Sequence, residues 1–251
     1  FCIKPSIKCR QKKSFIVQIE GGFNMAQKIN AHQLYTVLNQ LSLDKLFGKI
    51  TFSFAGVVVD INTTDTVGIT LQAWLKQFMI NNGIYFSEPY NTQEFPDFFL
   101  DDIYPYQNML EVKAFNYDRT PAFDIANFES YCSSVKDKPY RLDADYLVFG
   151  YVMDAYGNIS IKKLWLHKIW EIAGTSERYP LKTQVKRNMI YNIRPNTDFK
   201  FGRKGPFNSK EDFLFAIYHT LLSYKGEDFA NDWLFVMSQN FRQYYGYELQ
   251  F

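Results

Sequence analysis

The chain has 251 residues, 47% of them hydrophobic, which is enough to build one substantial core. No uninterrupted apolar run approaches the ~20 residues of a membrane span, and three irregularly spaced cysteines exclude a disulfide framework. A net charge of +2 gives no indication of a polyanionic partner. The lack of a membrane span predicts a soluble protein, and the few cysteines fit a reducing compartment.

Residues 1–24 have neither a helical nor a strand period and lack the cleavage site of a signal peptide. Glu20-Gly21-Gly22 could be a translated ribosome-binding site upstream of a start codon at Met25; the alternative is a disordered basic tail. This segment carries five basic residues and one acidic residue, so the net charge without it is −2 instead of +2. We expect residues 1–24 to be a non-native or disordered extension and residues 25–251 to form a single domain.

The first half of that domain predicts helices and strands in alternation. Apolar residues at helical spacing indicate amphipathic helices, and short apolar runs between turn residues indicate strands. The expected elements are a helix over 31–47, a strand over 50–61, a helix over 67–83, and β segments over 84–88, 95–101 and 109–115.

The second half begins with a helix over 127–136, followed by a hairpin of strands 145–153 and 159–170 around the turn 154–158. Two helices end the chain; Ser209 is the expected N-cap of the first, and the second includes 228–241. The predicted fold class is α/β, with a mixed central sheet flanked by helices and helical additions at the C-terminal end.

The stretch Pro96 to Phe115, PDFFLDDIYPYQNMLEVKAF, contains the candidate chemistry. Residues two apart on a strand share a face, so Glu111 and Lys113 project together while Val112 points to the opposite side. A neighbouring strand can bring Asp97 beside them. Two converging carboxylates suit a hard cation such as Mg²⁺.

This arrangement resembles the PD-(D/E)xK nuclease motif: Asp97 follows a proline, and thirteen residues separate it from Glu111-Val112-Lys113. The resemblance implies a restriction-endonuclease-like core in which Asp97, Glu111 and Lys113 are catalytic. It further implies that Asp97, Glu111 and the Val112 carbonyl bind Mg²⁺.

The resemblance leaves some ligands open. Some members add an acid from the preceding helix, where this chain offers only Gln72, a neutral ligand at best. Asp101 and Asp102 are possible substitutes for the first ligand, although capping of the turn is the favoured interpretation. The structural alternative is a hairpin on whose surface Glu111 and Lys113 neutralise each other.

Chain length, and the lack of helicase, P-loop and methyltransferase signatures, narrow the resemblance to a stand-alone type II restriction endonuclease. The segments LEVKAFNYDRTPAFDIANFESYCSS, ADYLVFGYVM, KKLWLHKIWEI and QVKRNMIYNIRP are similar to the NgoBV/NlaIV group. That similarity implies cleavage of double-stranded DNA at GGNNCC, a homodimer, a cognate DNA methyltransferase encoded nearby and a bacterial cytoplasmic location. The alternatives are a repair or RNA-directed nuclease of the same superfamily and an inactive DNA-binding module.

A basic segment between residues 178 and 210 contains a single acidic residue, Asp198. The ordinary interpretation of such a run is a solvated face. In a nuclease it becomes the expected DNA-binding segment, with phosphate contacts and guanine contacts from arginine and lysine. The candidates for phosphate contacts are Lys182, Lys186 and Arg187, and those for guanine contacts are Arg194, Arg203 and Lys204.

Overall fold

The computed structural model describes residues 26–91 and 94–250, so the predicted extension at residues 1–24 lies outside it. Its helices are α1 (Ala31–Gln40), α2 (Val67–Asn81), α3 (Phe128–Asp137), α4 (Ile169–Ile172), α5 (Lys210–Lys225) and α6 (Glu227–Tyr245). Its strands are β1 (Gly48–Phe54), β2 (Val57–Ile61), β3 (Phe98–Phe99), β4 (Met109–Asn116), β5 (Ala126–Asn127), β6 (Asp145–Met153), β7 (Asn158–Lys168), β8 (Thr183–Lys186) and β9 (Met189–Ile193). None of the helices in these ranges is long and apolar enough to cross a membrane.

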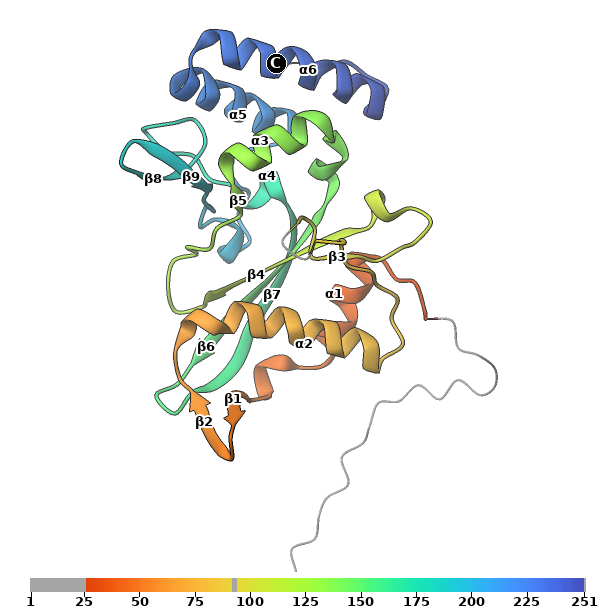
Figure 1. Ribbon diagram of the computed structural model, residues 1–251, viewed down its shortest axis with the longest axis vertical. Helices are drawn as coiled ribbons and strands as arrows, with labels where there is room; N and C mark the ends of the chain where they lie inside the picture. The colour runs from red at the N-terminus through yellow and green to blue at the C-terminus, as the bar shows by residue number, and fades with distance from the viewer. Residues whose placement is uncertain (1–25, 92–93, 251) are drawn as a thin grey trace, which may run out of the picture.

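A mixed six-stranded sheet forms the centre of the fold, in the order β2-β1-β7-β6-β4-β3. β4 and β6 pair in parallel, joined by the crossover that contains α3, and the other neighbours pair antiparallel. A small second sheet has the order β5-β9-β8. Figure 1 shows α3, α5 and α6 gathered at one end of the molecule and α1 and α2 at the other. The predicted mixed sheet flanked by helices, with helices added at the C-terminal end, is confirmed.

Two hydrophobic cores cover the two faces of the sheet. Because side chains alternate along a strand, Leu110 and Val112 of β4 join α1 and α2 in one core. Tyr146 and Val148 of β6 join α3, α5 and α6 in the other. Both strands read as nearly continuous buried runs, as expected for the centre of a sheet covered on both faces. Glu111 lies between Leu110 and Val112 on β4, so its side chain points to the opposite face of the sheet, toward α3.

Helix caps explain where several predicted elements begin. Ser209 is the N-cap of α5, and its hydroxyl accepts a hydrogen bond from the Asp212 N–H at 3.2 Å, as predicted. Asn127 caps α3 in the same way, accepting from the Ser130 N–H at 3.0 Å. The two caps thus fix the first residues of α3 and α5.

Several predicted elements differ from the structure. The β segment over 95–101 is a strand only at Phe98–Phe99, and the strand over 159–170 ends at Lys168, directly before α4 begins. The helix over 31–47 ends at Gln40, because Ser42 adopts a left-handed conformation with φ 52°. The strand over 50–61 is a hairpin: Ala55 and Gly56 both have positive φ, which gives the two-residue turn that joins β1 to β2. The segment 84–88 contributes isolated bridges instead of a strand.

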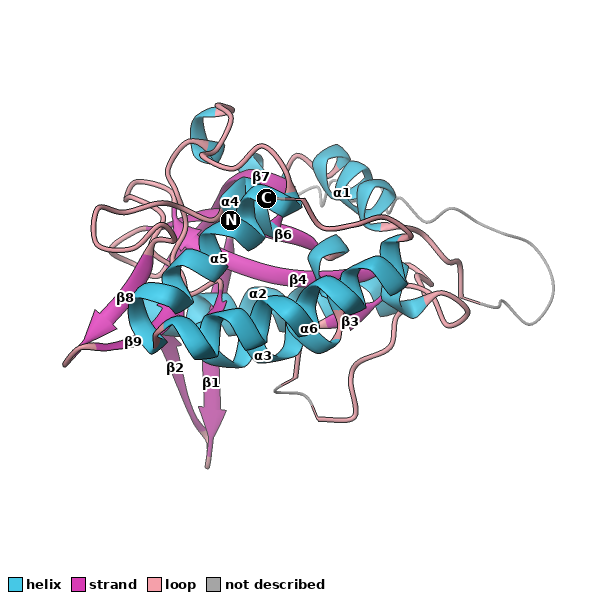
Figure 2. Cartoon of the chain, turned by 90° about the horizontal axis from the view of Figure 1, so that it is seen from above, coloured by secondary structure: helices cyan, strands magenta, loops and turns pink. Residues whose placement is uncertain are grey.

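The basic segment contains a hairpin that the sequence did not predict. β8 and β9 are joined by Arg187 and Asn188, with φ of 49° and 63°, the same type of tight turn as in the β1–β2 hairpin. Figure 2 shows both hairpins extending away from the body of the molecule. Arg187 therefore stands at a hairpin tip instead of in an irregular loop.

Gly150 of β6 is expected to be intolerant of a side chain. A Cβ there would lie 2.7 Å from Cζ3 of Trp165, whose ring packs at a tilt against Phe115 and edge-on against Phe199 in the core. Gly150→Ala should therefore lower the free energy of unfolding by about 1–3 kcal/mol, as overpacking does, measured by urea denaturation. The matched control is Gly48→Ala, because a Cβ at Gly48 meets nothing within 4 Å. Equal stability of the two variants would contradict the crowding at Gly150.

Candidate active site

The short β3–β4 ladder places Asp97 opposite Glu111. Phe98 pairs with Leu110, so the residue before Phe98 meets the residue after Leu110. The Asp97 N–H donates a hydrogen bond to Glu111 Oε2 at 3.2 Å, and the Val112 N–H donates to Asp97 Oδ2 at 2.7 Å. The two carboxylates predicted to converge are thus brought together by backbone contacts.

Lys113 completes the cluster from the same strand. Its Nζ lies 2.8 Å from Glu111 Oε1, and the side chains of Lys113 and Glu111 are only 19% and 11% exposed. The alternative interpretation, in which this pair is neutralised on an open surface, is therefore wrong. A buried ion pair beside a second carboxylate is expensive to maintain, which is the usual signature of a functional cluster.

Burial sets the charge state of this cluster. Removal from water, followed by the neighbouring charge of Glu111, raises the pKa of Asp97 to about 7, against the lowering effect of its hydrogen bonds. For Lys113, burial opposes the charged form, but the carboxylate and hydrogen bond of Glu111 outweigh it and raise the pKa of the ammonium. When Asp97 and Glu111 are both ionised, their two negative charges therefore exceed the single positive charge of Lys113.

Of the three other candidate ligands, Gln72 contacts the cluster, whereas Asp101 and Asp102 do not. Gln72 of α2 donates from Nε2 to Asp97 Oδ1 at 2.7 Å, so the neutral residue of the preceding helix does reach the site. Asp101 instead accepts hydrogen bonds from the N–H groups of Ile103 and Tyr104, at 2.7 and 3.0 Å. Asp102 forms an ion pair with Lys28. The capping interpretation is confirmed for Asp101, and neither aspartate substitutes for Asp97.

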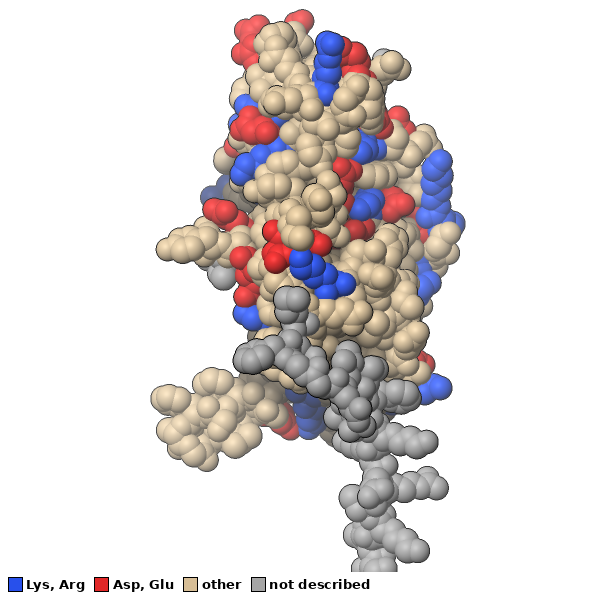
Figure 3. Space-filling model, turned by 90° about the vertical axis from the view of Figure 1, so that its right-hand side faces the viewer, with Lys and Arg blue, Asp and Glu red and all other residues tan. Residues whose placement is uncertain are grey.

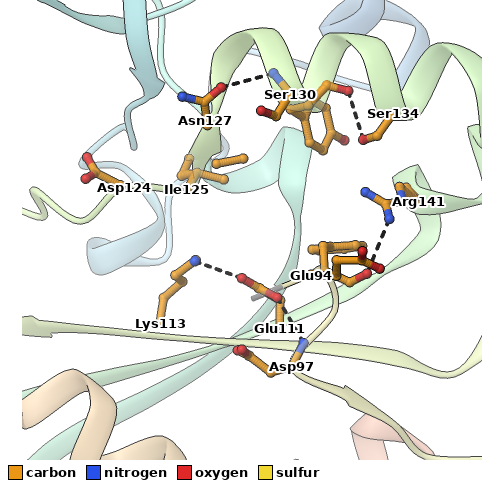
Figure 4. Close-up of a pocket in the computed structure, with 13 residues that line it drawn as sticks. Glu94, Asp97, Glu111, Lys113, Asp124, Ile125, Asn127, Ser130, Ser134 and Arg141 are labelled. Carbon is orange, nitrogen blue, oxygen red and sulfur yellow. Dashed lines mark hydrogen bonds and ion pairs between the residues drawn. The ribbon is translucent and has the colours of Figure 1, made fainter. Parts of the chain in front are cut away.

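A pocket of about 510 Å³ opens over the cluster, between β4 and α3. Figure 4 shows Asp97, Glu111 and Lys113 on one side of it and the first turns of α3 on the other. The remaining wall was not predicted from the sequence: Asp124 lies at one end, and Arg141 at the other donates to the Phe95 carbonyl at 3.3 Å. No strand period or motif spacing marks these residues, because tertiary packing alone brings them to the pocket.

Two buried tyrosine hydroxyls lie around this pocket. Tyr131 lines it, and Tyr146 is the register partner of Glu111 on β6. Both hydroxyls are buried without a protein hydrogen-bond partner, an arrangement that is uncommon in proteins. These two hydroxyl groups beside the carboxylates are therefore left for partners that the protein itself does not supply.

The donor set suits a cation with few protein ligands. In residues 26–91 and 94–250 no group of three or more His, Cys, Asp or Glu side chains could hold a metal ion. Asp97 and Glu111 are the adjacent acidic pair of this pocket, which Glu94 and Asp124 also line. The Val112 N–H points to the Asp97 edge of β4, and in a strand the carbonyl of a residue points to the same edge as its N–H. Mg²⁺ is commonly bound by one or two carboxylates together with water and phosphate oxygens, so these residues fit it.

Three of the six predicted DNA contacts are engaged within the protein. Arg194 forms an ion pair with Asp124 at the rim of the pocket. The other two engaged residues are Lys182, which donates to the Pro195 carbonyl at 2.9 Å, and Arg203, which pairs with Asp198 at 2.9 Å. These side chains would have to leave or share their partners to contact DNA.

The other three predicted contacts, Lys186, Arg187 and Lys204, are exposed. Lys186 ends β8, with its Nζ 5.6 Å from the centre of the Tyr191 ring, and Arg187 follows it in the hairpin turn. The basic segment is therefore divided between exposed cations on a projecting hairpin and cations already paired in the body of the fold.

Known proteins resemble this chain over most of its length. The model of the NgoBV restriction endonuclease family matches residues 28–251. The type II restriction enzyme NlaIV of Neisseria lactamica is 38% identical over 197 residues, which cover 77% of this chain and 81% of that protein. The type II restriction enzyme NgoBV of Neisseria gonorrhoeae is 34% identical over 161 residues, covering 64% and 91%.

The solved structure of the NlaIV restriction endonuclease has the same fold. It superimposes with a TM-score of 0.81 at 34% sequence identity, over 89% of this chain and 93% of the other. Fold, length and sequence therefore agree, and the resemblance recognised in the sequence is confirmed. The chain belongs to the NgoBV restriction endonuclease family.

Proposed function

We propose that this chain is a Mg²⁺-dependent type II restriction endonuclease whose residues 25–251 form one nuclease domain. Its relatives are named type II restriction enzymes, and such enzymes are site-specific deoxyribonucleases acting on double-stranded DNA. The observation that carries the proposal is the convergence of Asp97, Glu111 and Lys113 at one buried position under an open pocket.

Each member of the cluster has a part in the proposed hydrolysis of a DNA phosphodiester. Asp97, Glu111 and the Val112 carbonyl would hold Mg²⁺, which would lower the pKa of bound water and stabilise negative charge on the phosphate oxygens. Lys113 orients the attacking water and offsets the charge of the reacting phosphate. Gln72 holds Asp97 in place through its 2.7 Å hydrogen bond.

The finer proposals concern the substrate and its setting. The recognition sequence is GGNNCC, a palindrome that a two-fold symmetric homodimer reads most simply. A DNA methyltransferase encoded nearby protects the same sequence in the host genome, and the enzyme acts in the bacterial cytoplasm.

Digestion of a sequenced, unmethylated plasmid tests this proposal. The purified chain should give discrete fragments with Mg²⁺ and none with EDTA, and the fragment ends should lie at GGNNCC. A smear would favour a nuclease without sequence choice. Intact plasmid with folded protein would favour an inactive DNA-binding module, and cleavage of RNA alone would favour an RNA-directed nuclease.

DNA binding by the basic segment is a separate proposal, in which Lys182, Lys186 and Arg187 position the duplex and Arg194, Arg203 and Lys204 read guanines. The exposure of Lys186 and Arg187 on a projecting hairpin supports phosphate contacts there. Arg194 lies beside the pocket through Asp124, which supports a contact near the cleaved bond.

Lys186→Ala is expected to weaken binding to specific and unrelated duplexes by the same factor. Loss of one phosphate contact should also reduce the slope of log K against log salt concentration by about 1, measured by fluorescence anisotropy over a salt series. Lys45→Ala is the matched control, because Lys45 is exposed on the α1 side of the sheet. An unchanged slope for Lys186→Ala would show that this hairpin is only a solvated face.

Arg203→Ala, in contrast, should relax discrimination at one base pair.

A further inference from the structure

The β1–β2 hairpin forms an arm that leaves the main sheet. β1 pairs with β7 only at Gly48 and Lys49, and the arm beyond them projects from the body of the molecule (Figures 1 and 2). In Figure 3 the arm is the projection at the lower left, and its outer part is tan, without charged side chains. An isolated two-stranded ribbon has little stability of its own, so a partner surface is needed to hold it.

The arm has one apolar face and one more polar face. The cross-strand pairs on the apolar face are Ile50 with Ile61, Phe52 with Val59, and Phe54 with Val57. The opposite face presents Lys49, Thr51, Ser53, Val58 and Asp60, with Lys49 and Asp60 joined by a 2.7 Å ion pair. In antiparallel sheets this alternation marks one face for water and the other for a core.

Within the described part of the chain, Ile50 at the base of the apolar face packs against the core beneath α1 and α2, whereas the outer part of the face has no core over it. Phe52 and Phe54 are 58% and 71% exposed, and their rings stack 6.3 Å apart; Val57 and Val59 are exposed as well. Single proteins rarely leave a continuous apolar patch of this kind open to water. The face also lacks cations, which argues against a nucleic acid as its partner.

A second apolar surface lies at the base of the same arm. Leu46, Phe47, Gly48, Leu71 and Trp74 line part of a pocket of about 220 Å³, whose walls are mainly apolar. Phe47 is 75% exposed beside it. Each chain thus carries both an apolar tip and an apolar receptor, about one arm length apart.

We propose that the β1–β2 arm is the dimerisation element, and that its apolar tip packs against the pocket at the base of the arm of a second copy. Two arms related by a two-fold axis lie antiparallel, so each tip meets the base of the other and the interface is self-complementary.

The area and the chemistry both fit a second copy. At about 200 Å² per ring, the exposed parts of Phe47, Phe52 and Phe54 amount to roughly 400 Å². This is about half of what each partner buries in a stable complex, and the aliphatic neighbours supply more. The inference rests on the proposed function in one respect: duplex cleavage needs two strand cuts, and the described residues contain one Asp97-Glu111-Lys113 cluster.

Sedimentation velocity of the full chain tests the proposal. The natural protein should be a dimer, and Phe52→Ser combined with Phe54→Ser should weaken dimerisation by about a hundredfold or more, because two buried rings are lost from each half of the interface. The matched control is Phe229→Ser with Phe235→Ser, which removes two exposed rings from α6. A monomeric natural protein, an unchanged dimer in the arm variant, or dissociation of the α6 variant would each overturn the proposal.

Two further measurements make the result specific. Mild oxidation of a mixture of Phe47→Cys and Phe54→Cys chains should give a disulfide-linked heterodimer above the level of the parent chain, and its absence would refute the tip-to-base arrangement. Lys113→Ala should remain dimeric even when inactive. A wrong assignment of the dimer interface can therefore be told apart from a wrong assignment of the catalytic residues.

Discussion

Lys113→Ala is expected to lower the single-turnover rate of DNA cleavage at saturating Mg²⁺ by at least about 10³-fold. One group that assists proton transfer contributes 10²–10⁴-fold, and one group that stabilises transition-state charge contributes about 10²–10³-fold. Lys113 is the ammonium that the structure places beside both carboxylates, 2.8 Å from Glu111. Rapid-quench measurement on an oligonucleotide duplex separates this step from DNA binding and product release.

Two controls make the Lys113 result interpretable. Lys162→Ala removes an exposed lysine from β7 of the same sheet and should cleave at the natural rate. DNA affinity of Lys113→Ala should stay within a few fold of the natural value, since the loss is expected in the chemical step. A Lys113→Ala variant that cleaves within tenfold of the natural protein would contradict the proposed catalytic role of Lys113.

In EDTA, the contribution of Asp97 to the free energy of unfolding is expected to fall as the pH rises from about 4 to 7. The folded protein holds the Asp97 proton up to its raised pKa of about 7, whereas the unfolded chain releases it near the ordinary value. The folded state therefore binds more protons in this interval, and the free energy of unfolding decreases with pH. Each unit of pKa shift corresponds to about 1.4 kcal/mol, so the effect amounts to a few kcal/mol.

Asp97→Asn isolates this contribution, because the substitution leaves the carboxylates outside the cluster unchanged. The Asn side chain can still accept from the Val112 N–H and, after a turn of the Gln72 amide, donate to Gln72. The variant should therefore be more stable than the natural protein at pH 8 in EDTA, yet inactive and without Mg²⁺ stabilisation. Thermal unfolding at pH 5, 6, 7 and 8 measures the difference, and parallel curves for the two proteins would contradict the raised pKa.

The convergence of Asp97, Glu111 and Lys113 was predictable from sequence because two simple rules coincide. The two-residue period of a strand puts Glu111 and Lys113 on one face, and the β3–β4 register then requires only that Asp97 precede a paired strand. The walls of the pocket were not predictable by either rule. Asp124 and Arg141 reach the pocket from segments whose positions depend on how α3 packs over the sheet.

The fold shows the same division between local and tertiary signals. Ser209 marks the start of α5 because its side chain caps the helix locally. The β1–β2 turn at Ala55 and Gly56 lacks the Asn-Gly or Asp-Gly sequence that is typical of a tight hairpin, so the sequence predicts one continuous strand over 50–61. The pairing of Arg194 with Asp124, 70 positions away along the chain, also leaves no local trace.

The location of a bound divalent cation tests the central claim most directly. Mn²⁺ has an anomalous X-ray signal and takes the same oxygen ligands as Mg²⁺, so crystals of the chain with Mn²⁺ and an oligonucleotide duplex can locate it. We predict an anomalous peak bound by the carboxylates of Asp97 and Glu111, beside a DNA phosphate and within reach of Lys113. A peak at other acidic residues, with these carboxylates unligated, would contradict the assignment of this cluster as the nuclease centre.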